Sequence, residues 1–375
     1  MRDEQTSRAL TGALLTIAIV VAFYVGFRLP NTWSATLDAV SVTDGFHRRF
    51  VVGTLLRPLA IATDYNYWLF VGFSYAVLAA LIAILVRLAM RAQLLSRRLL
   101  IVAFFMLPTG PFLFHEVGYL EQVLYLVLFG CIYLAHRQKW VAATCVMALA
   151  PFVHEIAILT VLPIYGLVAL RTTSFKRAMI VTAIPTLVGL FVFLIPAASD
   201  EAVATLAAQL SRANFKYRHD ALELFGRSFE DNWRLYRLHE VVIHVKPVAF
   251  FVIGAFACLF WIDRGFAASK RWLVFVVSCA AIGLPGLLVL GGWDHNRWVF
   301  LLLTNFFVVL WMSLNGRGHE LRRGTIAVLV TALLVISHIN IFYFLPDSPR
   351  ELGYRAVRNF LKQMIDGRLF EKPTY

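Results

Sequence analysis

The segment 44–53 gathers several ionisable residues directly after the first long apolar run of the chain. Asp44, His47, Arg48 and Arg49 stand within six residues of one another. A carboxylate can act as a general base on a hydroxyl, and guanidinium groups can hold a phosphate and stabilise it as it leaves. The same residues could have only structural roles, because Asp often caps a helix and Arg can anchor to lipid phosphates.

Three further groups of ionisable residues stand in short gaps between apolar runs. Two are His-Glu pairs that closely follow a Pro-Phe dipeptide, and the third is an Asp and an Arg in one turn. They could line a site or pair with arginines to hold broken helices together. A single His-Glu pair is not a zinc motif, since no second ligand follows at helical spacing. The residues are His115 and Glu116, His154 and Glu155, and Asp294 with Arg297.

The composition identifies the kind of protein that must position these groups. The 375 residues are 60% hydrophobic, with a mean hydropathy of +0.72, which is well above the share in soluble domains. Many long runs lack charge, as membrane spans do. The net charge of +13 comes without a nucleic-acid-binding motif, so we expect no nucleic-acid partner. The sequence therefore predicts an all-α polytopic membrane protein.

The apolar runs predict about eleven transmembrane helices in one domain, 1–345, followed by an amphipathic tail, 346–375. Two regions are too long for one span. The first is broken near the middle by Pro108, Gly110 and Pro111 and the second by Pro151, so each is expected to form two shortened helices. Outer loops are expected at 28–66, with a short interfacial or re-entrant helix at 51–62, and at 198–246. The first run is expected to be a retained anchor. The expected spans are 9–27, 67–86, two each in 99–135 and 140–170, 178–197, 247–262, 272–290, 298–314 and 325–345.

Basic residues predict the orientation of these spans. With the N-terminus in the cytoplasm, the five short inner loops carry fifteen Lys and Arg, whereas the three short outer turns carry only Arg297. Short cytoplasmic loops are enriched in Lys and Arg. All four groups of ionisable residues then lie on the outer side. We expect the shortened helices to place the two His-Glu pairs in one cavity that opens to the outer face.

Transfer of a sugar from a lipid-linked phosphate would need this set of groups. The donor's polyprenyl tail lies in the bilayer, so the enzyme must offer a site at the membrane face. A carboxylate must accept the proton of the acceptor hydroxyl, and arginines must hold the lipid phosphate. Such a donor needs no nucleotide-binding fingerprint, and the sequence contains none.

The segment 45–53 resembles a Gly-Phe-x-Arg-Arg-x-x-x-Gly signature of largely uncharacterised bacterial membrane proteins. His-Glu in a broken span and Asp-x-x-Arg-Trp near a late span also recur there. The overall plan resembles the GT-C superfamily of glycosyltransferases, which places an acidic residue in the first outer loop. That superfamily often has a paired Asp/Glu motif, whereas Asp38 and Asp44 are five residues apart here. This departure leaves both the choice of base and the use of a divalent metal ion open.

The resemblance implies a bacterial inner-membrane glycosyltransferase that is active on the outer face. A polyprenyl-phosphate sugar is the expected donor, and a glycan or lipid is the expected acceptor. A polysaccharide polymerase or ligase remains an alternative, as does a transporter or lipid flippase. The expected residues are Asp44 and then Asp38 as base; Arg48, Arg49, Arg297 and His47 at the donor phosphate; and His115, Glu116, His154, Glu155 and Asp294 along the cavity.

Overall fold

The computed structural model describes residues 2–45, 48–195, 198–226, 238–262, 268–290, 294–314 and 349–373. Within these ranges all regular secondary structure is helical, as the sequence predicts. The helices are α1 (Arg2–Gly26), α2 (Thr32–Asp38), η1 (Val42–Asp44), α3 (Phe50–Ala62), α4 (Tyr67–Arg91), α5 (Leu95–Met106), α6 (Thr109–His115), α7 (Leu120–His136), α8 (Trp140–Val153), η2 (Glu155–Ile158), α9 (Val161–Thr172), α10 (Phe175–Leu194), α11 (Asp200–Leu210), α12 (His219–Gly226), α14 (Leu238–Ile262), α15 (Ala268–Gly283), η4 (Leu284–Leu290), α16 (His295–Ser313), α18 (Tyr354–Ile365) and η5 (Arg368–Phe370).

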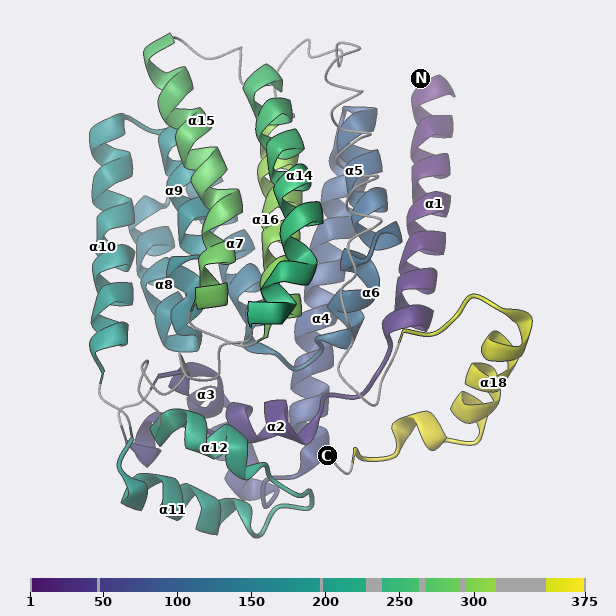
Figure 1. Cartoon of the computed structure of the whole chain (residues 1–375), viewed down its shortest axis with the longest axis vertical. Helices are drawn as coiled ribbons and strands as arrows, with labels where there is room; N and C mark the ends of the chain where they lie inside the picture. Colours follow the sequence, from purple (N-terminus) through teal and green to yellow (C-terminus); the bar gives the residue numbers. More distant parts are fainter. Residues whose placement is uncertain are drawn as a thin grey trace.

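The long helices form a bundle, and short helices gather at one end of it (Figure 1). Six described segments are long and apolar enough to cross a membrane, and the pair α5 and α6 forms a further span if counted as one. The protein is therefore a multi-pass helical membrane protein. Eleven spans remain a prediction, because the expected span 325–345 lies outside the described residues.

Both regions expected to contain two shortened helices are divided. The first breaks between α5 and α6, which meet at a bend of 54° beside Pro108, and then continues into α7. The second contains α8, which ends two residues after Pro151, and then η2 and α9. The helices α7 and α8 span only 17 and 14 residues. Each His-Glu pair therefore stands at the end of a helix, where its side chains can leave the apolar helix surface.

The loop-bearing end of the bundle, defined by α2, α3, α11 and α12, lies beside the C-terminal end of α1 (Figure 1). Helix α12 packs on α2, and α2 packs on α3. Gly53 allows the close approach of α3, because a Cβ atom there would lie 1.8 Å from the carbonyl oxygen of Val40. Gly45 has a φ of 115°, which side chains disfavour. The local structure thus explains both glycines of the 45–53 signature: Gly45 has a positive φ angle, and Gly53 allows close packing.

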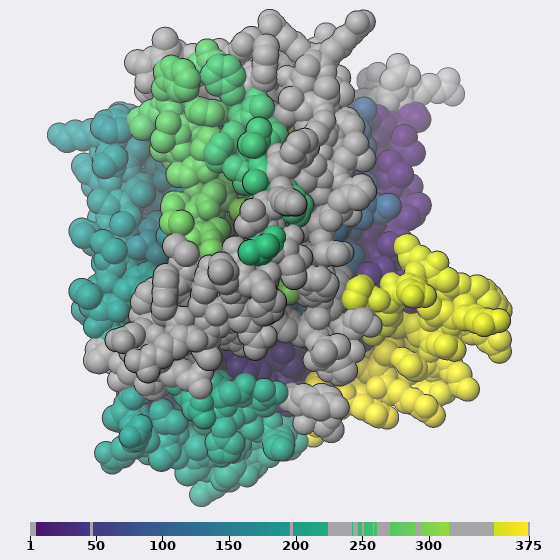
Figure 2. All heavy atoms as spheres, viewed as in Figure 1, coloured from purple at the N-terminus to yellow at the C-terminus, as the bar shows by residue number. Residues whose placement is uncertain are grey.

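The C-terminal helix α18 lies beside the same end of α1 and projects from the body of the molecule (Figures 1 and 2). The Phe360 ring lies 5.1 Å from that of Tyr24, measured between centroids. Arg350 donates hydrogen bonds from Nη1 to the carbonyl oxygens of Tyr24 and Phe27. The N-terminus lies at the opposite end of the bundle (Figure 1), an arrangement that an odd number of crossings would give.

Candidate functional site

Arg297, in the first turn of α16, lies at the centre of a buried cluster of charges. Its Nη1 atom is 3.1 Å from an oxygen of Asp294, and its Nη2 atom donates to Glu121 at the start of α7. Its Nε atom lies 3.7 Å from Glu116, which caps the C-terminus of α6. The ring of Tyr119 faces the guanidinium at 4.5 Å. One arginine thus joins the turn between α6 and α7 to the start of α16.

The second His-Glu pair extends this cluster to the first loop. His154 Nε2 lies 3.8 Å from Glu121, and His154 Nδ1 lies 3.2 Å from Glu155. The Glu155 carboxylate accepts hydrogen bonds from Nε and Nη2 of Arg49, the former at 3.0 Å. Arg49 has a φ of 64° where α3 begins, a conformation that costs roughly 1–3 kcal/mol in a non-glycine residue. The chain therefore accepts local strain at the residue that makes this contact.

Arg28 completes the cluster from the end of the first span. Its Nε atom donates to the carbonyl oxygen of His115, and its Nη2 atom lies 4.0 Å from Glu116. His115 itself is buried, with its ring 5.7 Å from that of Phe112. The structure therefore brings both His-Glu pairs into one connected group, whereas a cavity lined by them stays a prediction. These four residues are between 1% and 9% exposed, so access from the outer face remains a prediction.

The charges of this cluster do not balance if all carboxylates are ionised. Four carboxylates belong to it, and the three guanidiniums of Arg28, Arg49 and Arg297 face them. Buried charges are costly unless they are paired and hydrogen-bonded. Within the described chain, neither oxygen of Glu116 accepts a hydrogen bond. This carboxylate is therefore the best placed of the four to take up and release a proton or to meet a ligand. The four carboxylates are Glu116, Glu121, Glu155 and Asp294.

Asp44 is placed differently from the other acidic residues. Its Oδ2 atom accepts hydrogen bonds from the backbone nitrogen and hydroxyl of Ser41, at 2.9 and 2.8 Å. Its Oδ1 atom lies 3.1 Å from Nη1 of Arg57, in α3. These contacts are those of a capped turn with an ion pair. Arg48 donates from Nη2 to the carbonyl oxygen of Ile195.

Asp38, the second candidate base, lies at the end of α2 and is 2% exposed. Burial raises the pKa of its carboxyl well above the usual 3.8. Its Oδ1 atom has no hydrogen-bond partner among the described residues. Asp38 is therefore a candidate for a neutral carboxyl group. His47, expected at the donor phosphate, lies outside the described residues.

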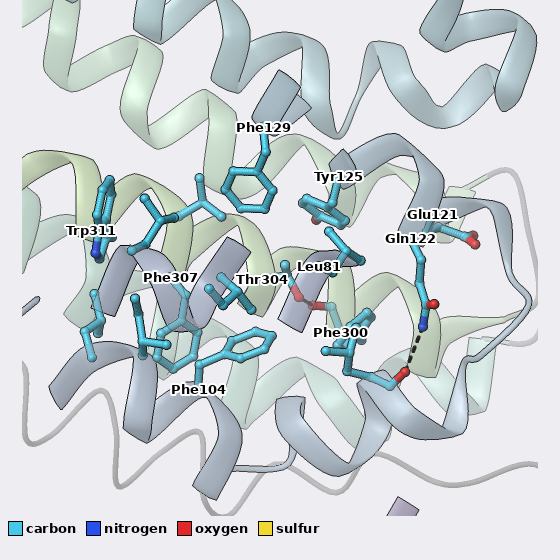
Figure 3. Close-up of a pocket in the computed structure, with 16 residues that line it drawn as sticks. Leu81, Phe104, Glu121, Gln122, Tyr125, Phe129, Phe300, Thr304, Phe307 and Trp311 are labelled. Atoms are coloured by element: carbon cyan, nitrogen blue, oxygen red, sulfur yellow. Dashed lines mark hydrogen bonds between the residues drawn. The ribbon is translucent and has the colours of Figure 1, made fainter. Parts of the chain in front are cut away.

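A narrow apolar crevice between α4, α5, α7 and α16 begins beside the charge cluster. Figure 3 shows Glu121 and Gln122 at one end and Trp311 at the other. The amide of Gln122 donates to the carbonyl oxygen of Leu113, which fixes its direction. The crevice has a volume of about 70 Å³, less than the roughly 150 Å³ of a cavity that binds benzene. Because most of its lining side chains are apolar, it suits a short segment of hydrocarbon chain better than a sugar ring.

Arg28, Arg57 and Tyr119 were not among the residues predicted to form the site. Arg28 directly follows the first span and looks like an ordinary flanking residue. Arg57 is the only charged residue of α3, which was the signal that could have identified it. In the described ranges, no group of three or more His, Cys, Asp or Glu side chains could hold a metal ion. The possible divalent metal ion therefore stays a prediction.

Comparison of the chain with family models, curated proteins and solved structures gives no match. The likeness to the GT-C superfamily therefore rests on the sequence motifs quoted above and on the general plan of the chain.

Proposed function

We propose that this chain is a membrane glycosyltransferase of GT-C type, active on the outer face of the bacterial inner membrane. It takes a sugar from a polyprenyl-phosphate-linked donor and transfers it to a glycan or lipid of the cell envelope. The observation that carries the proposal is the buried charge cluster at the head of an apolar crevice, with Glu121 belonging to both. These two surfaces suit a lipid with a charged head and a long apolar tail.

The phosphate of the donor is assigned to Arg48, Arg49 and Arg297. Arg49 and Arg297 already lie against carboxylates, so each is held in position before the donor arrives. Arg48 contacts a backbone carbonyl, and among the described residues it has no ion-pair partner. Its guanidinium is thus the most available of the three for a phosphate.

The general base is assigned to Glu116, with Asp44 as the alternative that the sequence motif predicts. Glu116 lies 3.7 Å from Arg297 and accepts no hydrogen bond within the described chain. It can therefore accept a proton close to the bound phosphate. The Asp44 carboxylate is already engaged by Ser41 and Arg57, so it is less free to meet the hydroxyl of an acceptor.

The proposal is tested with the purified protein in lipid nanodiscs, a polyprenyl-phosphate donor carrying a radiolabelled sugar, and cell-envelope glycan or lipid as acceptor. The proposal expects the label to become covalently attached to the acceptor. A flippase would instead move intact donor across the bilayer of a proteoliposome without breaking the sugar-phosphate bond. The proposal would be overturned if the protein flipped the donor but never cleaved its sugar-phosphate bond, whichever acceptor fraction was supplied.

A further inference from the structure

A second pocket lies at the loop-bearing end, between the C-terminal part of α3 and helix α11. Its volume is about 350 Å³, within the roughly 300–1,000 Å³ range of small-molecule pockets. Six of its eight lining residues are polar or charged, unlike those of the apolar crevice of Figure 3. The lining residues are Arg57, Ile61, Asp64, Tyr65, Thr205, Ala208, Gln209 and Arg212.

Two guanidinium groups supply hydrogen-bond donors to this pocket. Arg57 uses its Nη1 atom for Ser41 and Asp44, which fixes the group at the wall. Arg212 is exposed, and the described residues give its guanidinium neither a hydrogen bond nor an ion pair. The pocket therefore combines one guanidinium that is held in place with one that has no partner among the described residues. Such donors match the acceptor oxygens of a phosphate or a carboxylate.

The same pocket also offers groups suited to hydroxyls. Asp64 and Tyr65 stand in the turn that follows α3 and both have positive φ angles, of 47° and 52°, which non-glycine residues adopt at a cost. The Tyr65 hydroxyl donates to Oε1 of Gln209 at 3.0 Å, so the Gln209 amide nitrogen is oriented as a donor. The exposed Asp64 carboxylate can accept hydrogen bonds from hydroxyls.

We propose that this pocket binds an anionic sugar, with its phosphate or carboxylate on Arg57 and Arg212 and its hydroxyls on Asp64 and Gln209. A lipid phosphate alone would use the arginines but not the Asp64 carboxylate, which favours a sugar over a lipid headgroup. The inference rests on the proposed function in one respect, because it makes this pocket the site of an anionic acceptor. Arg57 also contacts Asp44, with Nη1 of Arg57 3.1 Å from Oδ1 of Asp44.

The test is equilibrium binding to the purified full-length protein in nanodiscs, which requires no transfer reaction. Glucose 1-phosphate, inorganic phosphate, glucose and a short-chain phosphatidic acid are compared as probes. The inference expects saturable binding of glucose 1-phosphate that is tighter than that of the other three. Arg212→Ala should weaken this binding about tenfold or more, since hydrogen bonds to charged groups are the strong ones.

Lys216→Ala is the matched control, because it removes the same charge from an exposed position on the same segment outside the pocket. It should leave binding within about twofold, and Arg212→Lys should restore part of the lost affinity. The inference would be overturned by any of three results: no saturable binding, an equal loss of glucose 1-phosphate affinity in the two alanine variants, or tighter binding of phosphatidic acid than of glucose 1-phosphate. Each of these results leaves the transfer assay unaffected, so the two proposals fail separately.

Discussion

Arg49 and Glu155 form an ion pair with two hydrogen bonds across 106 positions of the sequence. The pair joins the start of α3 to the break after α8. Both side chains are largely buried, so neither charge has ready access to bulk water. The contact therefore fixes the first loop against the second broken region, and it ties the opening motif to the charge cluster.

Removing one partner of this pair should destabilise the protein strongly. Arg49→Ala leaves a buried carboxylate without its partner, a situation that costs about 3–5 kcal/mol. We expect Arg49→Ala and Glu155→Ala to lower the thermal unfolding temperature in nanodiscs, and the double variant to lose less than the sum of the two. The exposed pair of Arg218 and Asp220 is the control, where loss of one partner should cost at most about 1 kcal/mol. Additive losses at Arg49 and Glu155 would contradict direct coupling.

Gly53→Ala should disrupt the packing of α3. The new Cβ atom would lie 1.8 Å from a backbone oxygen of Val40, and backbone cannot move aside as a flexible side chain can. We expect a clear fall in unfolding temperature and in the yield of folded protein. Gly72→Ala, in α4, is the matched control because no atom lies within 4 Å of its added Cβ. It should be neutral or stabilising, by up to about 1 kcal/mol. Similar behaviour of both variants would show that α3 does not pack as described.

Asp38 should make stability depend on pH. Its pKa is raised in the folded state by burial, so the folded protein holds a proton that the unfolded chain releases above about pH 4. Below that pH the neutral Asp38 carboxyl makes its full contribution to the stability of the folded protein. This contribution is lost as the pH rises toward the pKa that Asp38 has in the folded state. Asp38→Asn should therefore raise the unfolding temperature near pH 7 and flatten its fall between pH 4 and 7. A variant that lowers this temperature equally at pH 4 and pH 7 would instead indicate a lost contact.

The orientation can be tested with reporter fusions. Because the short loops rich in Lys and Arg are expected on the inside, fusions after Lys139 and Lys176 should report the cytoplasm. A fusion after Lys372 should report the outer side, since eleven crossings separate it from a cytoplasmic N-terminus. A cytoplasmic signal at Lys372 would require an even number of crossings and would remove the predicted topology.

Much of the helical plan follows from the sequence, because apolar run length and proline positions are local signals. The prediction of a short helix at 51–62 agrees with α3, Phe50–Ala62. The break at Pro108 was predicted because proline removes a hydrogen-bond donor and disturbs the preceding turn. Both His-Glu pairs stand in turns assigned to the same side of the membrane, which predicts that they share one cavity. The structure joins them in one buried cluster, and the cavity itself stays a prediction.

The individual ion pairs could not be predicted in this way. Asp44 stands four residues from Arg48, yet it pairs with Arg57 because η1 and Gly45 turn the chain back toward α3. Arg49 has a left-handed backbone conformation and pairs with Glu155. Such choices depend on backbone angles and on partners more than one hundred residues away, about which local residue patterns say nothing.

The most direct test of the central claim is single-turnover sugar transfer, measured beside donor binding, for Glu116→Gln and Asp44→Asn. If the cluster around Arg297 is the active site and Glu116 its base, Glu116→Gln should bind the polyprenyl-phosphate donor normally. Its transfer rate should fall about 100- to 10,000-fold, the usual contribution of a positioned base. Asp44→Asn should keep most of its rate. Near-normal transfer by Glu116→Gln, with the loss appearing in Asp44→Asn, would contradict the account and return the catalytic role to the opening motif.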